Sequence, residues 1–352
     1  MTDIRELIAS RVKDAYEKGC ALKIHAGNTK DFYGRNIKGI PLSLSGHTGI
    51  VEYEPSELYI TARSGTPLKE IEHVIEKENQ ILPCEPPHFG AAATVGGMVA
   101  AGLSGPRRVS SGAIRDCILG IEIINGKGEY LQFGGKVMKN VAGYDVSRLM
   151  CGALGTLGIL MSVTLRLLPK PVSEQTLAFP LNTSEAIQKM NSWARTPMPI
   201  TGTFHDSKNL YIRLAGSRST IEKCAEILGG YMVDRSHAFW SDVKEQATDF
   251  FMTDKPIWRI QVPPSTTPLK ISGSSLLEWN GALRWYASET ETSEIRRITE
   301  QAGGHACLFR RRSGTEDIFH PLSPHLLEIH RRLKRAFDPN GILNPGKIYC
   351  DF

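Results

Sequence analysis

The feature that most constrains this chain is a run of residues with almost no side-chain bulk at positions 92–102. It reads Ala-Ala-Thr-Val-Gly-Gly-Met-Val-Ala-Ala-Gly. Backbone this bare allows very close approach, either by another part of the chain or by a flat aromatic ligand. A tightly packed, buried helix or strand crossing and one wall of a ligand site are therefore both consistent with the run on its own.

A second bare segment, Gly27-Asn28-Thr29-Lys30, follows a short predicted strand at residues 21–25. Successive backbone N–H groups in such a turn can point into one concavity and hold a phosphate. An ordinary turn at the end of a strand is the competing interpretation, because short glycine motifs often match by chance.

Two further glycine-rich segments exclude other nucleotide sites. Residues 151–159 do not spell Gly-x-Gly-x-x-Gly and lie outside any clear βαβ unit, which disfavours a Rossmann dinucleotide site. Residues 341–348 nearly spell a phosphate-binding Walker loop, but Ile348 stands where a magnesium-binding Ser or Thr is needed. Only four residues follow, too few for the helix behind such a loop, so an NTPase is rejected.

The composition narrows the class of protein. Of 352 residues, 42 are Lys or Arg and 37 are Asp or Glu, a net charge of +5 that argues against a dedicated nucleic-acid binder. No run approaches the ~20 apolar residues of a membrane-spanning helix, and the N-terminus lacks the pattern of a secretory signal. Seven scattered cysteines without a Cys-x-x-Cys pair fit a reducing cytoplasm and argue against a resident iron–sulfur cluster or structural zinc.

Periodicity predicts a mixed α+β protein, and the length predicts two domains. Helices are predicted at residues 3–18, 67–79, 184–195, 219–228 and 321–337. Strands are predicted at residues 21–25, 50–53, 58–62, 118–124, 129–133, 162–167, 210–214 and 258–262. Asn125-Gly126 between two apolar runs indicates a hairpin. Pro169 and Pro171 stop a strand and mark a domain boundary.

Several segments in a fixed order resemble the FAD-binding fold of the vanillyl-alcohol oxidase and p-cresol methylhydroxylase flavoprotein superfamily. The resemblance runs almost unbroken from Ala21 to Pro169 and resumes at the end of the chain. Its segments are Leu-Pro-Cys-Glu-Pro-Pro (82–87), Ala-Thr-Val-Gly-Gly (93–97), Arg-Asp-Cys-Ile-Leu-Gly (115–120), residues 134–145, Gly-Thr-Leu-Gly-Ile (155–159) and Phe-Asp-Pro-Asn-Gly-Ile-Leu-Asn-Pro-Gly-Lys (337–347).

Four segments outside the general flavin motifs are similar to the smaller, FAD-binding E subunits of bacterial glycolate oxidases. They are Cys-Glu-Pro-Pro-His (84–88), Gly-Pro-Arg-Arg (105–108), Trp-Asn-Gly-Ala-Leu-Arg-Trp (279–285) and Gly-Gly-His-Ala (303–306). This resemblance implies a subunit of a glycolate oxidase or dehydrogenase complex that turns glycolate, a small 2-hydroxy acid, into glyoxylate. It implies two partners, a larger FAD-containing subunit and an iron–sulfur subunit. A stand-alone FAD-dependent dehydrogenase of the D-lactate type and a non-catalytic flavin-holding scaffold remain as alternatives.

The fold implied by the resemblance is α+β, with an FAD-binding domain of two α/β lobes at residues 1–171 and a reduced cap domain at residues 172–320. Residues 321–352 would return to the FAD domain. The FAD would be bound non-covalently, because His25 does not match the attachment motif of covalent flavoproteins. The long cap of relatives that oxidise 2-hydroxy acids carries His-x-Gly-x-Gly-Asn and Glu-His-Gly segments, and neither is present in this sequence.

The resemblance also implies which residues hold FAD. The pyrophosphate of FAD would contact the loop after the first strand. The flavin and its ribityl chain would contact the run at positions 92–102, and the adenosine end would contact a later glycine loop. In these three groups the residues are Gly27, Asn28, Thr29 and Lys30; Gly96, Gly97, Ala100, Ala101 and Gly102; Gly155 and Ile159. Gly112 and Asp116 would contact the flavin side, and Asn344 would return to the cofactor from the C-terminal segment.

Two residues are candidates for substrate chemistry, and one stretch for docking. Arg284 could grip a carboxylate and His305 could accept a hydroxyl proton, although a surface arginine and a loop histidine are the simpler interpretation. Residues 305–335 hold seven Lys or Arg against three Asp or Glu, a surplus of 7 − 3 = +4. A solvated helix face explains this surplus, and docking to an acidic partner or to the inner face of the cytoplasmic membrane is the alternative.

Overall fold

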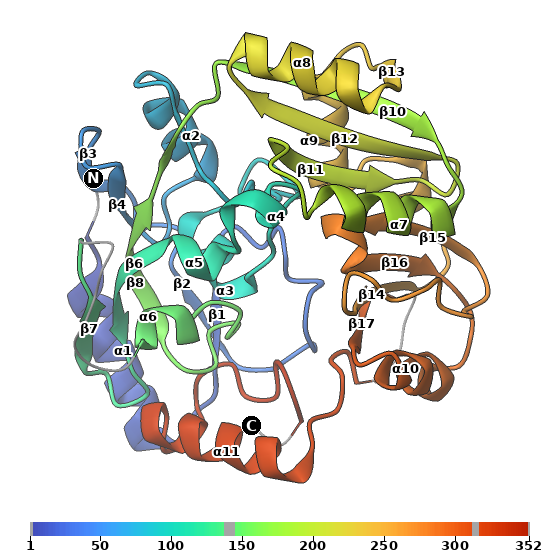
Figure 1. Ribbon diagram of the computed structural model, residues 1–352. Helices are drawn as coiled ribbons and strands as arrows, with labels where there is room; N and C mark the ends of the chain where they lie inside the picture. Colours follow the sequence, from blue (N-terminus) through green and yellow to red (C-terminus); the bar gives the residue numbers. More distant parts are fainter. Residues whose placement is uncertain (1–2, 137–144, 312–316, 351–352) are drawn as a thin grey trace. The chain divides into compact units, whose positions relative to one another are not determined.

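The computed structural model describes residues 3–136, 145–311 and 317–350, and its chain forms two compact units (Figure 1). The first unit combines Met1–Leu103, Ala113–Pro169 and Pro321–Phe352. The second combines Lys170–His320 with the short segment Ser104–Gly112, which lies inside the predicted range 1–171. The mixture of helices and sheets confirms the predicted α+β class.

The first lobe of the first unit is built on two parallel strands, β1 (Leu22–His25) and β2 (Ile40–Ser43). Helix α1 (Arg5–Lys18) buries Ile8 and Val12 in the core of this lobe. The C-terminal segment completes it, because Leu343 pairs in parallel with Leu22 of β1. Residues more than 300 positions apart in sequence are therefore direct neighbours at the start of the chain's first strand.

The second lobe is a five-stranded antiparallel sheet in the order β3-β4-β8-β6-β7. Its strands are β3 (Ile50–Glu54), β4 (Tyr59–Arg63), β6 (Ile118–Ile124), β7 (Tyr130–Gly134) and β8 (Ile159–Arg166). The predicted hairpin at Asn125-Gly126 joins β6 to β7. A small sheet of β5 (Gln80–Ile81) and β9 (Leu168–Pro169) lies in the same unit.

One face of this sheet is apolar and covered by helices. They are α2 (Leu68–Glu76), α3 (Val95–Ala101), α5 (Ile114–Cys117), α6 (Val146–Leu149) and α11 (Pro324–Phe337), all of which contribute side chains to the main core or pack against it. Apolar residues alternate with polar ones along the strands, so Ile60 and Val163 point into the core while Thr61 and Thr164 form a hydrogen bond of 2.9 Å on the opposite face.

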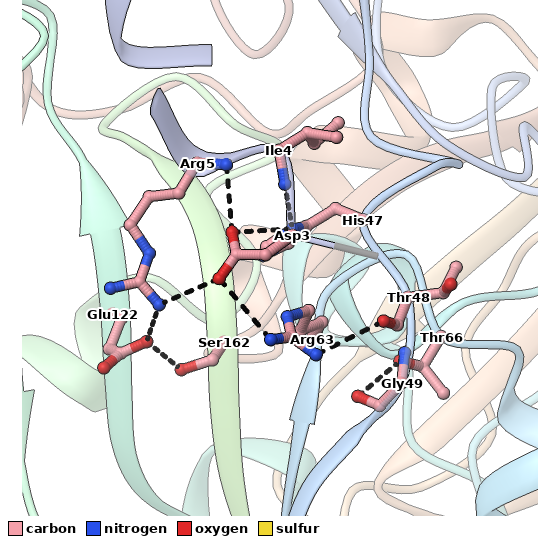
Figure 2. Close-up of polar contacts among 10 residues, drawn as sticks. All are labelled: Asp3, Ile4, Arg5, His47, Thr48, Gly49, Arg63, Thr66, Glu122 and Ser162. Atoms are coloured by element: carbon pink, nitrogen blue, oxygen red, sulfur yellow. Dashed lines mark hydrogen bonds and ion pairs between the residues drawn. The ribbon is translucent and has the colours of Figure 1, made fainter. Parts of the chain in front are cut away.

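Figure 2 shows how the start of the chain is attached to the polar face of the sheet. The Asp3 carboxylate accepts hydrogen bonds from the Arg5 backbone N–H at 3.0 Å and from an Arg63 Nη at 3.4 Å, and it lies 3.7 Å from His47 Nδ1. Arg5 reaches onward to Glu122, which accepts a 2.6 Å hydrogen bond from Ser162. Burial lowers the pKa of His47 and outweighs the opposing effect of Asp3.

The second unit is an eight-stranded sheet in the order β13-β10-β12-β11-β15-β16-β14-β17. Its strands are β10 (Ser173–Pro180), β11 (Ile200–His205), β12 (Asn209–Gly216), β13 (Tyr231–Met232), β14 (Ile257–Gln261), β15 (Ser274–Glu278), β16 (Leu283–Ala287) and β17 (His305–Arg310). Its helices are α4 (Arg108–Ser111), α7 (Thr183–Trp193), α8 (Arg218–Leu228), α9 (Ser236–Glu245) and α10 (Thr292–Gln301), with short 3₁₀ turns at Asp249–Phe251 and Trp279–Gly281.

The two faces of the larger sheet differ. Helices α7, α8 and α10 share apolar cores with one face, whereas Phe239 and Trp240 of α9 lie against the other. Within residues 3–136, 145–311 and 317–350, the longest apolar helical stretch falls short of what a bilayer crossing needs. The same residues contain no group of three or more His, Cys, Asp or Glu side chains arranged to hold a metal ion.

Candidate cofactor site

A hollow in the first unit collects most of the bare residues that the sequence analysis singled out. It is open to solvent, and its empty volume, including the part that is continuous with solvent, is about 560 Å³. Three walls enclose it: β1 with the loop that follows, helix α3, and the C-terminal segment. Its lining residues are Ile24, Ala26, Gly27, Asn28, Thr29, Lys30, Asp31, Tyr33, Thr94, Gly97, Ala100, Ala101, Leu154, Asn344 and Lys347.

The loop after β1 offers backbone donors to this hollow. A Cβ on Gly27 would lie 1.6 Å from the Ala92 carbonyl oxygen, so the loop can approach the bare run only because residue 27 is glycine. Asn28 takes the left-handed conformation, with φ 56°. Among the described residues, the backbone N–H groups of Gly27, Asn28 and Thr29 have no acceptor within the chain. Three successive unpaired donors in a tight turn suit a phosphate.

Helix α3 contributes a smooth wall rather than donors. The N–H of Gly97 donates to Thr94 Oγ1 at 3.1 Å, and the N–H groups of Val95 and Gly96 donate to the carbonyls of Thr66 and Ser64. The first turn of the helix is therefore satisfied by the protein itself. Gly97, Ala100 and Ala101 leave that side of the hollow with nothing larger than a methyl group.

Asn344 holds two walls of the hollow together. Its side-chain oxygen accepts from the Ile24 N–H at 2.8 Å, and its side-chain nitrogen donates to the Leu154 carbonyl at 2.7 Å. Gly155 follows Leu154, and a Cβ there would lie 2.8 Å from the Asn344 nitrogen. Asn344 is buried and uses both ends of its amide to fix the protein, which leaves the backbone loop as the main source of donors.

Two lysines give the hollow positive charge. Lys30 Nζ donates to the His88 carbonyl at 3.1 Å, and Lys347 Nζ lies 3.3 Å from Asp31 Oδ1. Burial alone would raise the pKa of Asp31, but the charges of Lys347 and Lys23 outweigh it and lower that pKa. Lys347 was not among the predicted contacts, although it closes the Asn-Pro-Gly-Lys segment (344–347) that carried part of the resemblance.

Six of the residues assigned to FAD do not line the hollow, among them Gly155, which packs beside Asn344. Gly96 packs against Ser64, where a Cβ would lie 2.6 Å from the Ser64 Cβ, and Gly102 ends α3 in the left-handed conformation. Ile159 points into an apolar core. The Asp116 carboxylate accepts from the Ala113 N–H at 2.9 Å, and Gly112 belongs to the second unit. Gly96 and Gly102 shape α3, and the roles predicted for all six remain predictions.

The second unit separates the two residues predicted for substrate chemistry, which corrects the idea that Arg284 and His305 act as a pair. Strand register places Arg284 opposite Ile260, which in turn lies opposite Ala306, on the face that helix α10 covers. His305 lies opposite Gln261, on the other face. Arg284 is fully buried and donates to the carbonyls of Gly281 at 3.0 Å, Thr267 at 2.7 Å and Thr266, so its guanidinium anchors a loop.

A different set of polar side chains shares the face of His305. We call this set the Glu278 face, and it consists of Arg259, Gln261, Glu278, Trp285 and His305. His305 Nε2 lies 2.7 Å from Gln261 Oε1, and Trp285 Nε1 donates to Glu278 Oε1 at 2.7 Å.

Two pKa shifts and one free guanidinium characterise the Glu278 face. Burial raises the pKa of Glu278 to about 7. Partial desolvation lowers the pKa of His305, and the nearby Arg259 charge adds to this effect. Arg259 lies 5.3 Å from the Trp279 ring, and its guanidinium has no hydrogen-bond acceptor among the described residues. An arginine in this state is available to a carboxylate ligand.

A turn with unusual backbone links two of the four segments that resemble glycolate oxidase subunits, residues 105–108 and 279–285. Trp279, Asn280 and Gly281 all have positive φ, at 54°, 57° and 87°. Two consecutive non-glycine residues in the left-handed region are costly unless their surroundings fix them. Here Asn280 N–H donates to Thr203 Oγ1 at 2.8 Å, and Trp279 Nε1 donates to the Gly105 carbonyl at 3.0 Å. The Arg108 guanidinium covers the Trp279 ring at 4.3 Å.

Comparison with known proteins gives the family. The family model described as FAD binding domain matches residues 3–134, and the model described as FAD linked oxidases, C-terminal domain, matches residues 320–348. The glycolate oxidase subunit GlcE of Escherichia coli (strain K12) is 43% identical over 349 residues, which is 99% of this chain and 98% of that protein. The chain belongs to the GlcE family. The predicted flavoprotein superfamily and the FAD cofactor are thereby confirmed.

Relatives outside the GlcE family match shorter parts of the chain. The glycolate oxidase subunit GlcD of Bacillus subtilis (strain 168) is 31% identical over 176 residues, 49% of this chain and 37% of that protein. A D-lactate dehydrogenase of Archaeoglobus fulgidus is 30% identical over 219 residues, 60% of this chain and 48% of that protein. An alkyldihydroxyacetonephosphate synthase structure has the same fold, with a TM-score of 0.64 at 15% identity, covering 97% of this chain and 74% of that one.

The residues of the hollow fit the diphosphate part of FAD. Gly27 leaves room for close approach, the loop supplies three unpaired N–H donors, and Lys30 and Lys347 supply positive charge. Gly97, Ala100 and Ala101 provide bare wall for an extended ligand. This combination of neutral donors and few charges is how proteins commonly bind an anionic dinucleotide.

Proposed function

We propose that the protein is the FAD-holding subunit of a glycolate oxidase that converts glycolate to glyoxylate. The observation that carries this proposal is the match to GlcE over 99% of the chain, joined to a hollow whose donors suit a diphosphate. Bound FAD supplies an acceptor for the two electrons and the hydrogen removed from a 2-hydroxy acid. The chain's own residues bind that cofactor, orient the substrate and hold the proton.

The loop of Gly27, Asn28 and Thr29 would hold the FAD diphosphate through backbone N–H groups. Lys30 and Lys347 would offset its charge, and the surface of Gly97, Ala100 and Ala101 would support the rest of the molecule. No residue of the hollow needs a covalent bond to the cofactor, so we propose non-covalent binding.

The Glu278 face is the proposed substrate side. The unpaired guanidinium of Arg259 would donate two hydrogen bonds to the substrate carboxylate, the role predicted from the sequence for Arg284. His305 is neutral at pH 7, because its pKa is lowered from 6.5, and its imidazole can accept the hydroxyl proton. Gln261 would hold the ring in place through the contact at Nε2, which leaves Nδ1 as the base.

Partner subunits are part of the proposal. The E. coli relative is named as a subunit, and the partial match to GlcD is consistent with an assembly of related flavoprotein chains. We propose that electrons leave this chain through a larger FAD-containing subunit and an iron–sulfur subunit. We also propose a cytoplasmic location with peripheral contact to the inner membrane face, in which exposed arginines of α11 such as Arg332 would meet anionic lipid.

A visible spectrum of the purified chain, alone and reassembled with its partners, tests the function. Yellow protein that acid releases as free FAD is expected, with anaerobic bleaching by glycolate in the assembly. Bleaching of the isolated chain by D-lactate in preference to glycolate would favour the stand-alone dehydrogenase that the Archaeoglobus relative suggests. Bound FAD that no hydroxy acid bleaches, with or without partners, would show a scaffold. Correctly folded protein that takes up no FAD would end the proposal.

A further inference from the structure

A buried ion pair between Lys334 and Asp338 contacts two chain segments that adjoin the hollow, one at Thr156 and the other at Leu343. Lys334 is the one buried residue of α11, and its side chain is 5% exposed. Its ammonium donates to Asp338 Oδ2 at 2.7 Å, to the Thr156 carbonyl at 2.7 Å and to the Leu343 carbonyl at 2.8 Å. All three donor positions of the lysine are therefore used.

Asp338 organises the other side of the pair. Its Oδ1 accepts from the Ile342 N–H at 3.1 Å, and its Oδ2 accepts from the Leu343 N–H at 2.7 Å. The carboxylate also packs against the β6-β7 turn, where a Cβ on Gly126 would lie 2.4 Å from Asp338 Oδ1. The chain from 338 to 343 is thus wrapped around one buried carboxylate.

The residues bound by this pair stand next to residues that line the hollow. Leu343 precedes Asn344, and Thr156 lies two positions after Leu154, the partner of the Asn344 side chain. The Asn344 N–H donates to the Leu22 carbonyl of β1. Lys334 therefore joins the segment of Thr156 to that of Leu343. The Asn344 side chain joins the same two segments through the Leu154 carbonyl.

We propose that Lys334 and Asp338 form a latch that seats Asn344 and thereby sets the affinity for FAD. They are positioning residues, because neither side chain lines the hollow. The proposal rests on the FAD site assigned above. It follows that seating of residues 342–344 and occupancy of the hollow favour one another, because coupling between two equilibria is reciprocal.

Removal of one partner is expected to be worse than removal of both. A single substitution leaves the remaining charge buried without its counter-charge, whereas an uncharged pair of similar volume avoids that situation. Desolvation lowers the pKa of Lys334 against the opposing effect of Asp338, in keeping with a buried charge whose one counter-charge is that carboxylate.

The test compares Lys334→Met, Asp338→Asn, the double variant and Arg335→Met as a matched control. Arg335 is the next residue on the same helix, but its side chain is 65% exposed and bonds to Glu328. In titrations of apo-protein followed by flavin fluorescence, each single variant should bind FAD at least ~10-fold more weakly. The double variant should lose less FAD affinity than either single variant, and the control should match the wild type.

Hydrogen exchange separates this proposal from the function on which it rests. Without FAD, Lys334→Met should speed exchange at the Leu343 and Asn344 amides, and that measurement stands even if the wild type binds no FAD. Should a single variant fail to fold, wild-type protein still answers: FAD must slow exchange at these two amides. Two results would overturn the latch. One is unchanged FAD affinity in a folded Lys334→Met protein. The other is exchange at the Leu343 and Asn344 amides that neither Lys334→Met nor bound FAD changes.

Discussion

The two candidate sites of this molecule differ in what forms them, which is backbone in the first unit and polar side chains in the second. In the first unit, the hollow for FAD depends on what is missing: a Gly27 side chain, a large residue at Gly97 or Ala100, and acceptors for three backbone N–H groups. In the second unit, the Glu278 face depends on side chains that are present: a free guanidinium, an imidazole and a buried carboxyl group.

This difference predicts how each site responds to change. A backbone cradle carries no titratable group of its own and tolerates almost no added volume. A cluster of charged side chains tolerates changes of shape better, but its behaviour depends on pH and on single functional groups. Substitutions that add a methyl group should therefore damage the first site, and substitutions that remove a charge should damage the second.

Gly27→Ala is the strongest test of the backbone site. The new methyl carbon would lie 1.6 Å from the Ala92 carbonyl oxygen, and both chain segments are held by their neighbours. We expect a loss of at least ~3 kcal/mol in the free energy of unfolding and no measurable FAD binding. Urea unfolding and flavin titration measure the two effects.

Gly46→Ala is the matched control for this experiment. A Cβ at Gly46 meets nothing within 4 Å, and residue 46 is not among the positive-φ glycines. It should change neither property. If Gly27→Ala bound FAD as the wild type does, the cradle would not be the diphosphate site.

Glu278→Gln tests whether the Glu278 face makes the stability of the protein depend on pH, which the backbone site cannot do. Burial raises the pKa of Glu278 to about 7, from 4.5. The folded state then binds more protons than the unfolded state between these values, so the wild type loses stability as pH rises from 4.5 to 7 and levels off above.

The glutamine keeps an acceptor for Trp285 Nε1 and removes the titration. At pH 8 we expect it to be more stable than the wild type by up to about 3 kcal/mol, with little difference at pH 4.5. Thermal unfolding across this range measures the gap. An equal gap at both pH values would mean that Glu278 is not the titrating group.

Arg259→Met should impair the assembled enzyme without affecting FAD. Loss of a charge-assisted contact to a carboxylate costs about 1.5–3 kcal/mol, so kcat/KM for glycolate should fall roughly 10- to 100-fold. Most of the loss should appear in KM, because the contact is made in the ground state as well. Arg297→Met is the control, since Arg297 is exposed and pairs with Glu294 on α10. Unchanged kinetics in Arg259→Met would remove the Glu278 face from the substrate side.

Much of the first unit could be predicted from the sequence because its signals are local. Helix α1, strand β1, the hairpin at Asn125-Gly126 and the bare turn at Gly27 each follow from a few adjacent residues. The hollow gathers seven predicted contacts, Gly27 to Lys30, Gly97, Ala100 and Ala101, with Asn344 from the far end of the sequence. That last contact came from the resemblance, since no local pattern shows that residue 344 lies beside residue 24.

The second unit was harder to predict because its signals depend on strand register. Arg284 and His305 look alike as candidates in sequence, and only the pairing of β16, β14 and β17 places them on opposite faces. Arg259 carries no motif that marks it, and its lack of an acceptor is visible only in three dimensions. Lys347 could have been identified, because it ends a segment that already supplied Asn344.

Asp3→Ala is the mildest test, and it probes a charged cluster that belongs to neither site. Asp3 joins Arg5, Arg63 and His47 in Figure 2, but its side chain is 40% exposed and its contacts to the two arginine side chains are 3.4 Å or longer. Burial alone would raise the pKa of Asp3. The hydrogen bond from the Arg5 N–H and the charges of Arg5, His47 and Arg63 outweigh burial and lower that pKa. Its stabilising effect is therefore complete above pH 3.8 and is lost as pH falls through the lowered value.

At pH 7 we expect Asp3→Ala to lower the free energy of unfolding by less than about 1 kcal/mol, and 1 M NaCl should shrink the difference further. FAD affinity should not change, since none of these residues lines the hollow. A loss of several kcal/mol that persists in salt would contradict this expectation. It would mean that the attachment of the N-terminal segment is as intolerant of change as the Gly27 cradle, and that side-chain clusters in the first unit can matter as much as its backbone.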